Sequence, residues 1–350
     1  MRYPKNLQKG GIIGFVAPSF GCATEPYKSA FLNAQKKFKE MGYQCQLGPN
    51  CYASEGIGIS NTPEKCGKEL TEGYVSGEND CLISCGGGEM MCEILEHVDF
   101  EAIRKAPAKW YLGYSDNTNF TYLLTTLCDT ASVYGPCAGD FGMEPWHPSV
   151  KDSFGVLTGE VRTVRNYDGW ERIDGGLKTE EDPLQPYHIT EPFMLKKYPD
   201  QDADFSGRLL GGCLDCLVNL KGTEFDKTVE FVEKYKEDGI IWFLEACELN
   251  VFSIRRAVWQ LDHAGWFKYT KGFLIGRPML FDQPMMGLDQ YRAVTDILGK
   301  YQVPIIMDAD LGHLHPAMPI ITGSLGRVQV RDNSISICME CRYRAAMIPL

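Results

Sequence analysis

The chain has no apolar run of about 18 residues, the length that a membrane-spanning helix needs, and we expect no membrane span. It also lacks an excess of positive charge, because 35 Lys and Arg residues stand against 46 Asp and Glu residues, a formal net charge of −11. Without a basic cluster to neutralise phosphates, nucleic acid is not expected as a partner. The apolar segment 11–17 is short and interrupted by glycine, unlike a signal peptide, so a cytoplasmic protein is expected.

The 14 cysteines do not have the distribution of a disulfide scaffold. They are scattered over 350 residues, whereas disulfide-rich secreted domains are short. Two Cys-x-x-Cys pairs, Cys213/Cys216 and Cys338/Cys341, could in principle supply four zinc ligands. The second pair ends an alternating segment typical of a strand, where residues three apart point to opposite faces. We therefore expect reduced, buried thiols, with no metal and no organic cofactor.

Strand-like and helix-like segments alternate through the first part of the chain. The strand-like segments are 11–17, 43–47, 80–84 and 109–113, and the amphipathic segments are 26–41, 63–74, 89–96 and 118–127. Such alternation implies right-handed crossovers between parallel strands. It predicts an α/β fold with a doubly wound, Rossmann-like (flavodoxin-like) parallel sheet.

The pattern changes after residue 141, where Pro, Trp, Asp and Lys cluster as far as about residue 205. A long irregular stretch of this kind is typical of a linker or a functional loop. Strand-like runs then return at 208–210, 239–244, 272–275, 305–308 and 334–338, with helical segments at 214–220 and 253–264. A chain of 350 residues also favours two domains. We predict an N-terminal α/β domain over 1–165, a linker over 166–205 and a C-terminal α/β domain over 206–350.

A serine lies at the turn that leads from a predicted strand into a predicted helix. Ser115 is the third residue of the segment 113–118, Gly-Tyr-Ser-Asp-Asn-Thr. In such a turn a nucleophile is exposed, and the helix N-terminus faces developing negative charge. The match to Gly-x-Ser-x-Gly is partial, because Asn117 replaces the second Gly. The alternative is that Ser115 and Asp116 only cap the helix.

Three consecutive glycines follow the strand-like segment 80–84, within the sequence Cys-Gly-Gly-Gly-Glu at 85–89. Glycines allow backbone N–H groups to approach a phosphate or an oxyanion closely. The spacing is not that of a dinucleotide-binding or P-loop fingerprint, and a plain tight turn is the alternative. If Ser115 is a nucleophile, the N–H of Asp116 and one N–H of this loop could hold the oxyanion.

The second half of the chain offers candidate partners for the serine. Glu245 directly follows the apolar strand-like run at 239–244, at the sheet edge where α/β sites gather, and Glu248 is the competing carboxylate. His313 follows Gly312 in a loop after another strand-like run and is a candidate general base. A purely structural histidine is the alternative.

Several short motifs follow one another in an order that resembles the LD-carboxypeptidase family. They are Gly-Tyr-Ser-Asp-Asn-Thr at 113–118, Tyr-Gly-Pro at 134–136, Phe-Gly at 141–142, Gly-Gly at 211–212, Phe-Leu-Glu at 243–245, Gly-Arg at 276–277 and Gly-His at 312–313. The resemblance spans nearly the whole chain. This family consists of serine peptidases, including murein tetrapeptide carboxypeptidases and microcin C immunity peptidases.

The resemblance implies a Ser-Glu-His triad. Ser115 would be the nucleophile, His313 the general base and Glu245 the carboxylate that orients the imidazole. The nucleophile would then lie in the first domain and both of its partners in the second, so catalysis would require the two domains to be docked.

The resemblance also implies an oxyanion hole formed by backbone N–H groups of Asp116 and of Gly87 or Gly88. The segment 85–89 departs from the Arg-Gly-Gly-Tyr-Gly of many murein-type members. The segment 134–136 is closer to the microcin immunity branch, and the chain resembles that branch most.

In that branch an aromatic residue of the linker is expected to stack on an adenine. Trp170 is the candidate here, and packing on its own domain is the alternative. We expect a serine peptidase or amidase that acts on a murein L,D-peptide or on a peptidyl or aminoacyl adenylate, and the resemblance implies a homodimer. A non-catalytic protein of the same fold that binds a phosphate or a nucleotide is the alternative.

Overall fold

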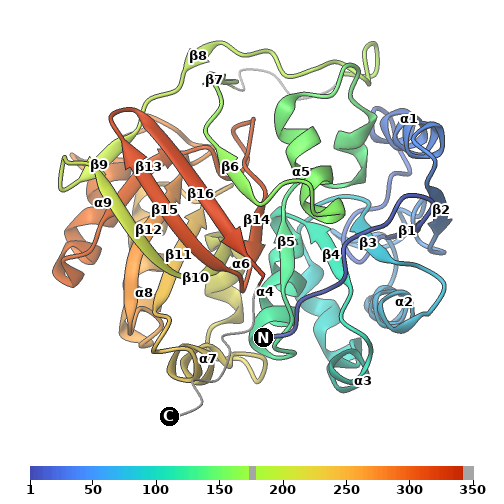
Figure 1. Cartoon of the computed structure of the whole chain (residues 1–350), viewed down its shortest axis with the longest axis horizontal. Helices are drawn as coiled ribbons and strands as arrows, with labels where there is room; N and C mark the ends of the chain where they lie inside the picture. Colours follow the sequence, from blue (N-terminus) through green and yellow to red (C-terminus); the bar gives the residue numbers. More distant parts are fainter. Residues whose placement is uncertain (173–178, 342–350) are drawn as a thin grey trace, which may run out of the picture.

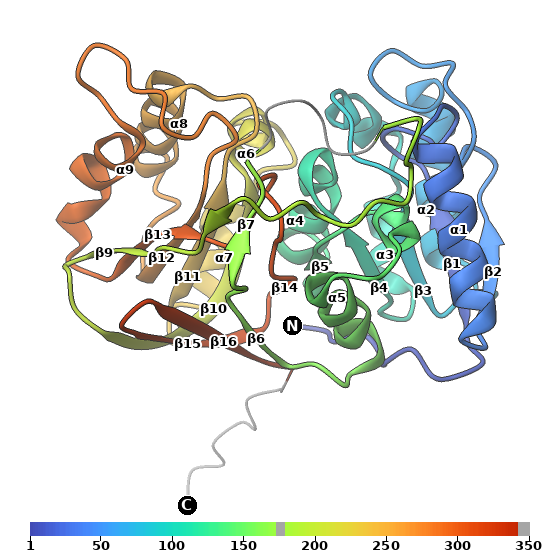
Figure 2. The same ribbon diagram turned by 90° about the horizontal axis from the view of Figure 1, so that it is seen from above.

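The computed structural model describes residues 1–172 and 179–341. Two β-sheets lie beside each other, each with helices packed on it (Figures 1 and 2). The predicted α/β fold is confirmed. The last nine residues of the predicted C-terminal domain, 342–350, lie outside the described residues.

The first sheet has the strand order β2-β1-β3-β4-β5 with β14 added at its edge. Its strands are β1 (Ile12–Val16), β2 (Gln44–Leu47), β3 (Cys81–Ser84), β4 (Trp110–Gly113), β5 (Ser132–Tyr134) and β14 (Ile320–Thr322). The first five strands are parallel, in the flavodoxin-like order, and β14 is antiparallel to β5. The predicted doubly wound sheet is therefore present.

Helices cover both faces of the first sheet, because successive strand residues point to opposite faces. The helices are α1 (Tyr27–Glu40), α2 (Pro63–Val75), α3 (Phe100–Lys105), α4 (Thr118–Thr126) and α5 (Pro148–Thr158). Phe15 of β1 packs with Phe31 and Phe38 of α1, whereas the next residue, Val16, packs with Leu70 of α2 on the other face. The helix predicted over 89–96 is a short 3₁₀ helix, η1 (Met91–His97).

The second sheet has a parallel centre and antiparallel edges, in the order β6-β16-β15-β10-β11-β12-β13-β9. Its strands are β6 (Thr163–Arg165), β9 (Lys196–Tyr198), β10 (Ala203–Cys213), β11 (Ile240–Glu245), β12 (Thr270–Gly276), β13 (Ile305–Ala309), β15 (Leu325–Arg331) and β16 (Ser334–Glu340). The helices that follow its strands are α6 (Leu214–Leu220), α7 (Thr228–Lys234), α8 (Val251–His263) and α9 (Gln290–Leu298). Every residue of β11 is buried, as expected for a parallel strand covered on both faces.

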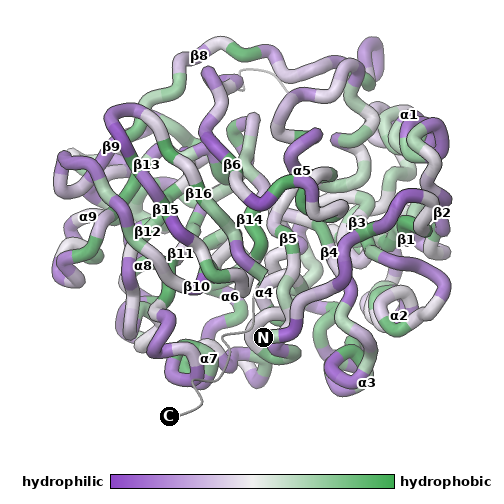
Figure 3. The backbone as a smooth tube through the Cα atoms, in the orientation of Figure 1, coloured by the Kyte–Doolittle hydropathy of each residue, from purple (hydrophilic) through white to green (hydrophobic). Residues whose placement is uncertain are grey.

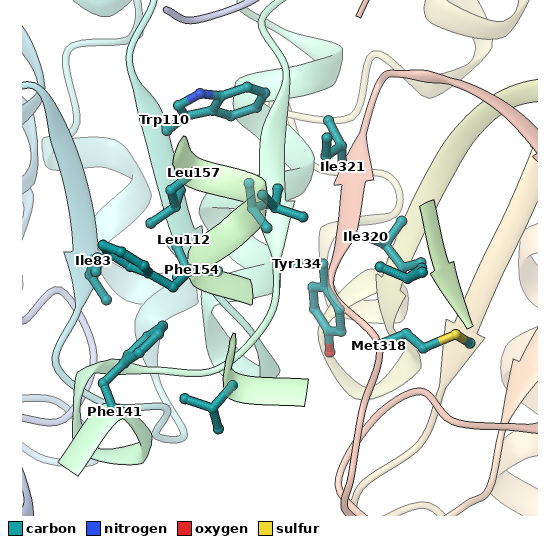
Figure 4. Packing of buried hydrophobic residues seen from close by; sticks show 14 of the residues in the cluster. Ile83, Trp110, Leu112, Tyr134, Phe141, Phe154, Leu157, Met318, Ile320 and Ile321 are labelled. Atoms are coloured by element: carbon teal, nitrogen blue, oxygen red, sulfur yellow. The ribbon is translucent and has the colours of Figure 1, made fainter. Parts of the chain in front are cut away.

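Two strands pair with the sheet that is formed mainly by the other half of the chain. β6 precedes the predicted boundary at 165 yet pairs with β16 in the second sheet. β14 belongs to the C-terminal half yet pairs with β5, so that Ile320 lies opposite Tyr134. Figure 4 shows Tyr134 beside β14, near the labelled Ile320 and Met318. The two halves are therefore joined by strand exchange as well as by the connecting segment.

The stretch after residue 141 is more ordered than the composition suggests. It contains α5, which starts at Pro148 and is capped by His147, whose Nδ1 accepts the N–H of Ser149 at 3.1 Å. Proline is favoured in the first turn of a helix, so the dipeptide His147-Pro148 indicates a helix start. The polar residues around it made this helix hard to recognise in the sequence. Within 166–205 the described chain forms the short pair β7 (Gly169–Trp170) and β8 (Glu191–Pro192), then β9 and the start of β10.

One hydrophobic core connects the two sheets. Val133 of β5, Ile320 of β14, Leu209 of β10 and Phe243 of β11 belong to the same buried cluster. Figure 3 shows hydrophobic residues along the inner strands and hydrophilic residues along the outer loops. Loops at the ends of strands from both sheets are therefore held against a common interior. Among the described residues, no helix combines the length and the apolar character that crossing a membrane would require.

Candidate active site

Ser115 lies at the turn between β4 and α4, where the short 3₁₀ helix η2 (Ser115–Asn117) begins. Its φ of 62° is in the left-handed region, which is uncommon for residues other than glycine and is typical of a strained nucleophile turn. Asn117 anchors the turn, because its Nδ2 donates to the carbonyl of Gly86 at 2.8 Å and to that of Tyr114 at 3.1 Å. The Ser115 hydroxyl faces a histidine rather than capping the helix.

The structure brings Ser115, His313 and Glu245 together. The Nε2 of His313 is 2.8 Å from the Oγ of Ser115, and its Nδ1 is 2.8 Å from the Oε2 of Glu245. A carboxylate accepts only, so Nδ1 carries a proton toward Glu245, and Nε2 is left to accept the serine hydroxyl. Glu245 ends β11, and His313 lies in the loop after β13. This is the arrangement that activates a hydroxyl as a nucleophile.

Burial and charge oppose each other in the pair formed by Glu245 and His313. Burial alone would raise the pKa of Glu245, but the charge of His313 and hydrogen bonds from His313 and Tyr134 lower that pKa below its ordinary value. Burial alone would lower the pKa of His313, but the Glu245 carboxylate raises it well above 6.5. The imidazolium that forms when His313 takes a proton is therefore stabilised by Glu245.

Tyr134 completes the hydrogen-bond chain, and sequence reasoning assigned it no role. Its hydroxyl donates to the Oε1 of Glu245 at 2.6 Å and accepts the backbone N–H of Ser115 at 3.2 Å. Both oxygens of Glu245 are thus occupied, one by His313 and one by Tyr134. Tyr134 ends a parallel strand of the first sheet, and that position was the signal that could have pointed to it.

The glycine loop lies directly against Ser115. A Cβ placed on Gly87 would lie 3.2 Å from the Ser115 Oγ, and one on Gly88 would lie 2.2 Å from the Oγ of Ser19. The N–H of Phe20 donates to the carbonyl of Gly87 at 2.8 Å and holds the loop in place. A side chain at Gly87 would therefore crowd Ser115, and one at Gly88 would collide with Ser19, whose hydroxyl bonds to the Asp116 carboxylate.

The Asp116 side chain is a structural anchor. Its carboxylate is buried and accepts hydrogen bonds from the Oγ of Ser19 at 2.5 Å, the N–H of Met91 at 2.9 Å and the Nδ2 of Asn119 at 3.0 Å. Burial raises its pKa despite these donors. The first N–H groups of a helix have no acceptor within that helix, and the N–H of Asp116 is one of them.

A second histidine of the same loop, His315, and the competing carboxylate, Glu248, are placed differently. The ring of His315 stacks on Tyr187, with centroids 4.8 Å apart, and is buried. Glu248 is exposed, three residues beyond the strand end that carries Glu245.

Trp170 does not lie open to a ligand. Its side chain is 5% exposed, its ring contacts Phe281 with centroids 5.0 Å apart, and the Arg277 guanidinium lies 5.1 Å from its centre. In this conformation the ring packs on its own protein, and the structure does not bring it together with the triad residues.

A cavity of about 420 Å³ opens beside Ser115. Its described lining includes the acidic residues Glu89, Asp116, Asp215 and Glu248 but no Lys, Arg or His. Cys213 and Cys216 lie at this cavity, and the Sγ of Cys216 is 3.6 Å from the carbonyl oxygen of Ser115. Within residues 1–172 and 179–341, no group of three His, Cys, Asp or Glu side chains is arranged to hold a metal ion.

Known proteins share this sequence pattern and fold. The LD-carboxypeptidase N-terminal domain matches residues 13–135, and the C-terminal domain of that family matches residues 206–328. The microcin C7 self-immunity protein MccF of Escherichia coli is 24% identical over 342 residues, which are 95% of this chain and 94% of MccF. A Vibrio cholerae protein, named as a carboxypeptidase by inference, is 24% identical over 344 residues, covering 96% of this chain and 98% of that protein.

Solved structures of the same group superpose over almost the whole chain. MccF in complex with aspartyl sulfamoyl adenosine has a TM-score of 0.80 and 23% identity, covering 97% of this chain and 99% of MccF. An MccF-like protein from Bacillus anthracis has a TM-score of 0.81 and 21% identity, covering 97% and 100%. The two-sheet architecture is therefore shared with these proteins.

Tyr134→Phe tests the hydrogen bonds that support the carboxylate. A hydrogen bond to a charged group contributes about 1.5–3 kcal/mol, so we expect Ser115 to react with a fluorophosphonate roughly 10- to 100-fold more slowly. The rate of phosphonylation is measured by intact mass. Tyr122→Phe is the control, because among the described residues that buried hydroxyl bonds to Thr228, at 2.8 Å, and to no member of the triad. Equal rates in the two variants would contradict a role for Tyr134.

Gly312→Ala tests how tightly the Glu245 carboxylate is held. A Cβ at Gly312 would lie 2.5 Å from the Oε2 of Glu245, at a φ of 93°. We expect a large loss of phosphonylation rate, because the carboxylate has to move away from His313. Gly287→Ala is the matched control, since its φ of 80° carries similar strain but its Cβ would meet no atom within 4 Å. If both variants react at the rate of the original protein, the proposed contact is not needed.

Proposed function

The chain belongs to the LD-carboxypeptidase family, and on that basis we propose that it is a serine hydrolase that cleaves an amide bond through Ser115, His313 and Glu245. The observation that carries this proposal is the unbroken hydrogen-bond chain from the serine hydroxyl through the imidazole to the carboxylate. A structural serine would not need an imidazole at 2.8 Å that is itself held by a buried acid.

The proposed reaction has two stages. The Oγ of Ser115 attacks the carbonyl carbon while the Nε2 of His313 takes its proton, and the resulting imidazolium then donates that proton to the departing nitrogen. Water, deprotonated by the same imidazole, cleaves the acyl–serine ester and restores the hydroxyl. Glu245 holds the imidazole in the required tautomer and stabilises its charged form, and Tyr134 holds Glu245.

The oxyanion of the tetrahedral intermediate is proposed to lie between the N–H of Asp116 and an N–H of Gly87 or Gly88. The close approach of Gly87 to Ser115 supports this placement, because a donor has to lie about 2.7–3.1 Å from the oxyanion. The start of η2 and α4 adds the positive end of a helix dipole at the same point.

For the substrate we propose a conjugate in which an aminoacyl or peptidyl group is joined to a nucleotide. MccF has been solved with aspartyl sulfamoyl adenosine and with glutamyl sulfamoyl guanosine, and this supports the assignment for a related fold. A murein L,D-peptide is the other class, supported by the carboxypeptidase names of the family.

Ser115→Ala tests the nucleophile directly. We expect the variant to lose fluorophosphonate labelling and to hydrolyse aspartyl sulfamoyl adenosine slower by a factor on the order of 10⁴. His313→Ala should be equally inactive, whereas His315→Ala, which alters a ring stacked on Tyr187, should retain most of the turnover. Full labelling of Ser115→Ala would instead favour a non-catalytic binding protein.

The pH dependence of kcat/KM follows from the raised pKa of His313. The general base has to be neutral, so kcat/KM is expected to fall as the pH drops through a value above 6.5. In Glu245→Gln the carboxylate that raises this pKa is gone, so the residual activity should have its acid limb at lower pH. Glu230→Gln, a change at an exposed residue of α7, should leave the limb where it was. An acid limb that does not move in Glu245→Gln would contradict the pairing.

A further inference from the structure

The cavity beside Ser115 has a strongly acidic character that the proposed chemistry does not require. Glu89, Asp215 and Glu248 contribute carboxylates to its lining. No described residue forms an ion pair with any of the three, and none of the described lining residues is a cation. A substrate group that enters this cavity therefore meets carboxylates that no Lys or Arg of the described lining neutralises, with only a smaller opposing effect of His313 on Glu89.

The carboxylates come from both halves of the molecule and are held close to the nucleophile. Asp215 accepts the backbone N–H of Cys247 at 3.0 Å and that of Glu248 at 2.9 Å, which fixes the segment just beyond Glu245. Glu89 directly follows the glycine loop, and its own N–H donates to the carbonyl of Gly58 at 3.0 Å. Glu89 and Glu248 are thus carried by anchored backbone on segments next to the triad and the glycine loop.

Two observations indicate that the cavity would accept a hydrogen-bond donor. Asn119 is 2% exposed and lines the cavity, and its Oδ1 has no hydrogen-bond partner among the described residues. Partial burial, followed by the charge of Glu248, raises the pKa of Glu89, so the two carboxylates feel each other across the cavity. A cation between them would relieve that repulsion and could also donate to Asn119.

We propose that the cavity binds a primary ammonium group at the end of the acyl side chain, so that Glu89 and Glu248 make the enzyme selective for basic aminoacyl substrates. This inference rests on the proposed function and names its substrate class. In an aminoacyl-nucleotide conjugate the leaving side carries the anionic phosphate or sulfamate. The acidic cavity repels that side and attracts an amine, so the acyl group is the part that enters. An acidic aminoacyl group is disfavoured for the same reason.

Three sulfamoyl adenosines that differ only in the side chain of the acyl group test the proposal, and all three carry the same α-ammonium group. The lysyl side chain ends in an ammonium group, the norleucyl side chain has the same four carbons without charge, and the glutamyl side chain ends in a carboxylate. We expect kcat/KM to decrease in that order. Partly exposed ion pairs contribute up to about 1 kcal/mol each, so each carboxylate should contribute roughly fivefold to the preference for lysyl over norleucyl.

The double variant Glu89→Gln/Glu248→Gln should bring the ratio of lysyl to norleucyl kcat/KM close to one. Glu93→Gln is the matched control, because Glu93 is exposed and lies four residues from Glu89 but does not line the cavity, so this variant should keep the ratio of the original protein. A ratio near one in the original protein, or an unchanged ratio in the double variant, would overturn the inference.

Dissociation constants of the same compounds for Ser115→Ala separate this inference from the proposed function. The order lysyl, norleucyl, glutamyl in affinity supports the inference even if none is hydrolysed by the original protein. If all three compounds are hydrolysed without a preference for the lysyl compound, the inference is overturned and the proposed hydrolase function is supported. If no compound is hydrolysed and Ser115 is not labelled, the proposed hydrolase function is contradicted. The inference about the cavity is then decided by the dissociation constants.

Discussion

The hydrogen bond between the Ser115 hydroxyl and the His313 imidazole is the contact on which the rest of this structure depends. It is 2.8 Å long and joins residues 198 positions apart in the chain, one after a strand of the first sheet and the other after a strand of the second. Proton transfer tolerates little displacement of the two atoms, so the relative position of the sheets has to be held firmly.

Two features of the fold supply that rigidity. β14 leaves the C-terminal half to pair with β5, and a single hydrophobic core extends from β1 to β11. Tyr134 adds a polar link, because it belongs to the first sheet yet donates to Glu245 of the second. Packed interiors resist small displacements. These contacts therefore hold the catalytic residues in position without a closing motion of the two domains.

Alternating segments predicted the first sheet. Residues that follow strands offered Ser115, Glu245 and His313 as candidates, with alternatives open, and the resemblance to the LD-carboxypeptidase family implied that the three act together. The exchange of β6 and β14 could not be predicted, because strand pairing between distant segments leaves no local signature. Tyr134 was missed for the same reason, since its role appears only when β5 and β11 lie together. The acidic lining also depends on tertiary structure, because Glu89 and Glu248 are 159 positions apart.

The most direct test is a crystal structure of the protein after reaction with a fluorophosphonate. We expect phosphorus bonded to the Oγ of Ser115, with the phosphonyl oxygen about 2.7–3.1 Å from the N–H groups of Asp116 and of Gly87 or Gly88. We also expect His313 to remain paired with Glu245 in the adduct. An adduct on another residue, or a phosphonyl oxygen directed away from both N–H groups, would contradict it.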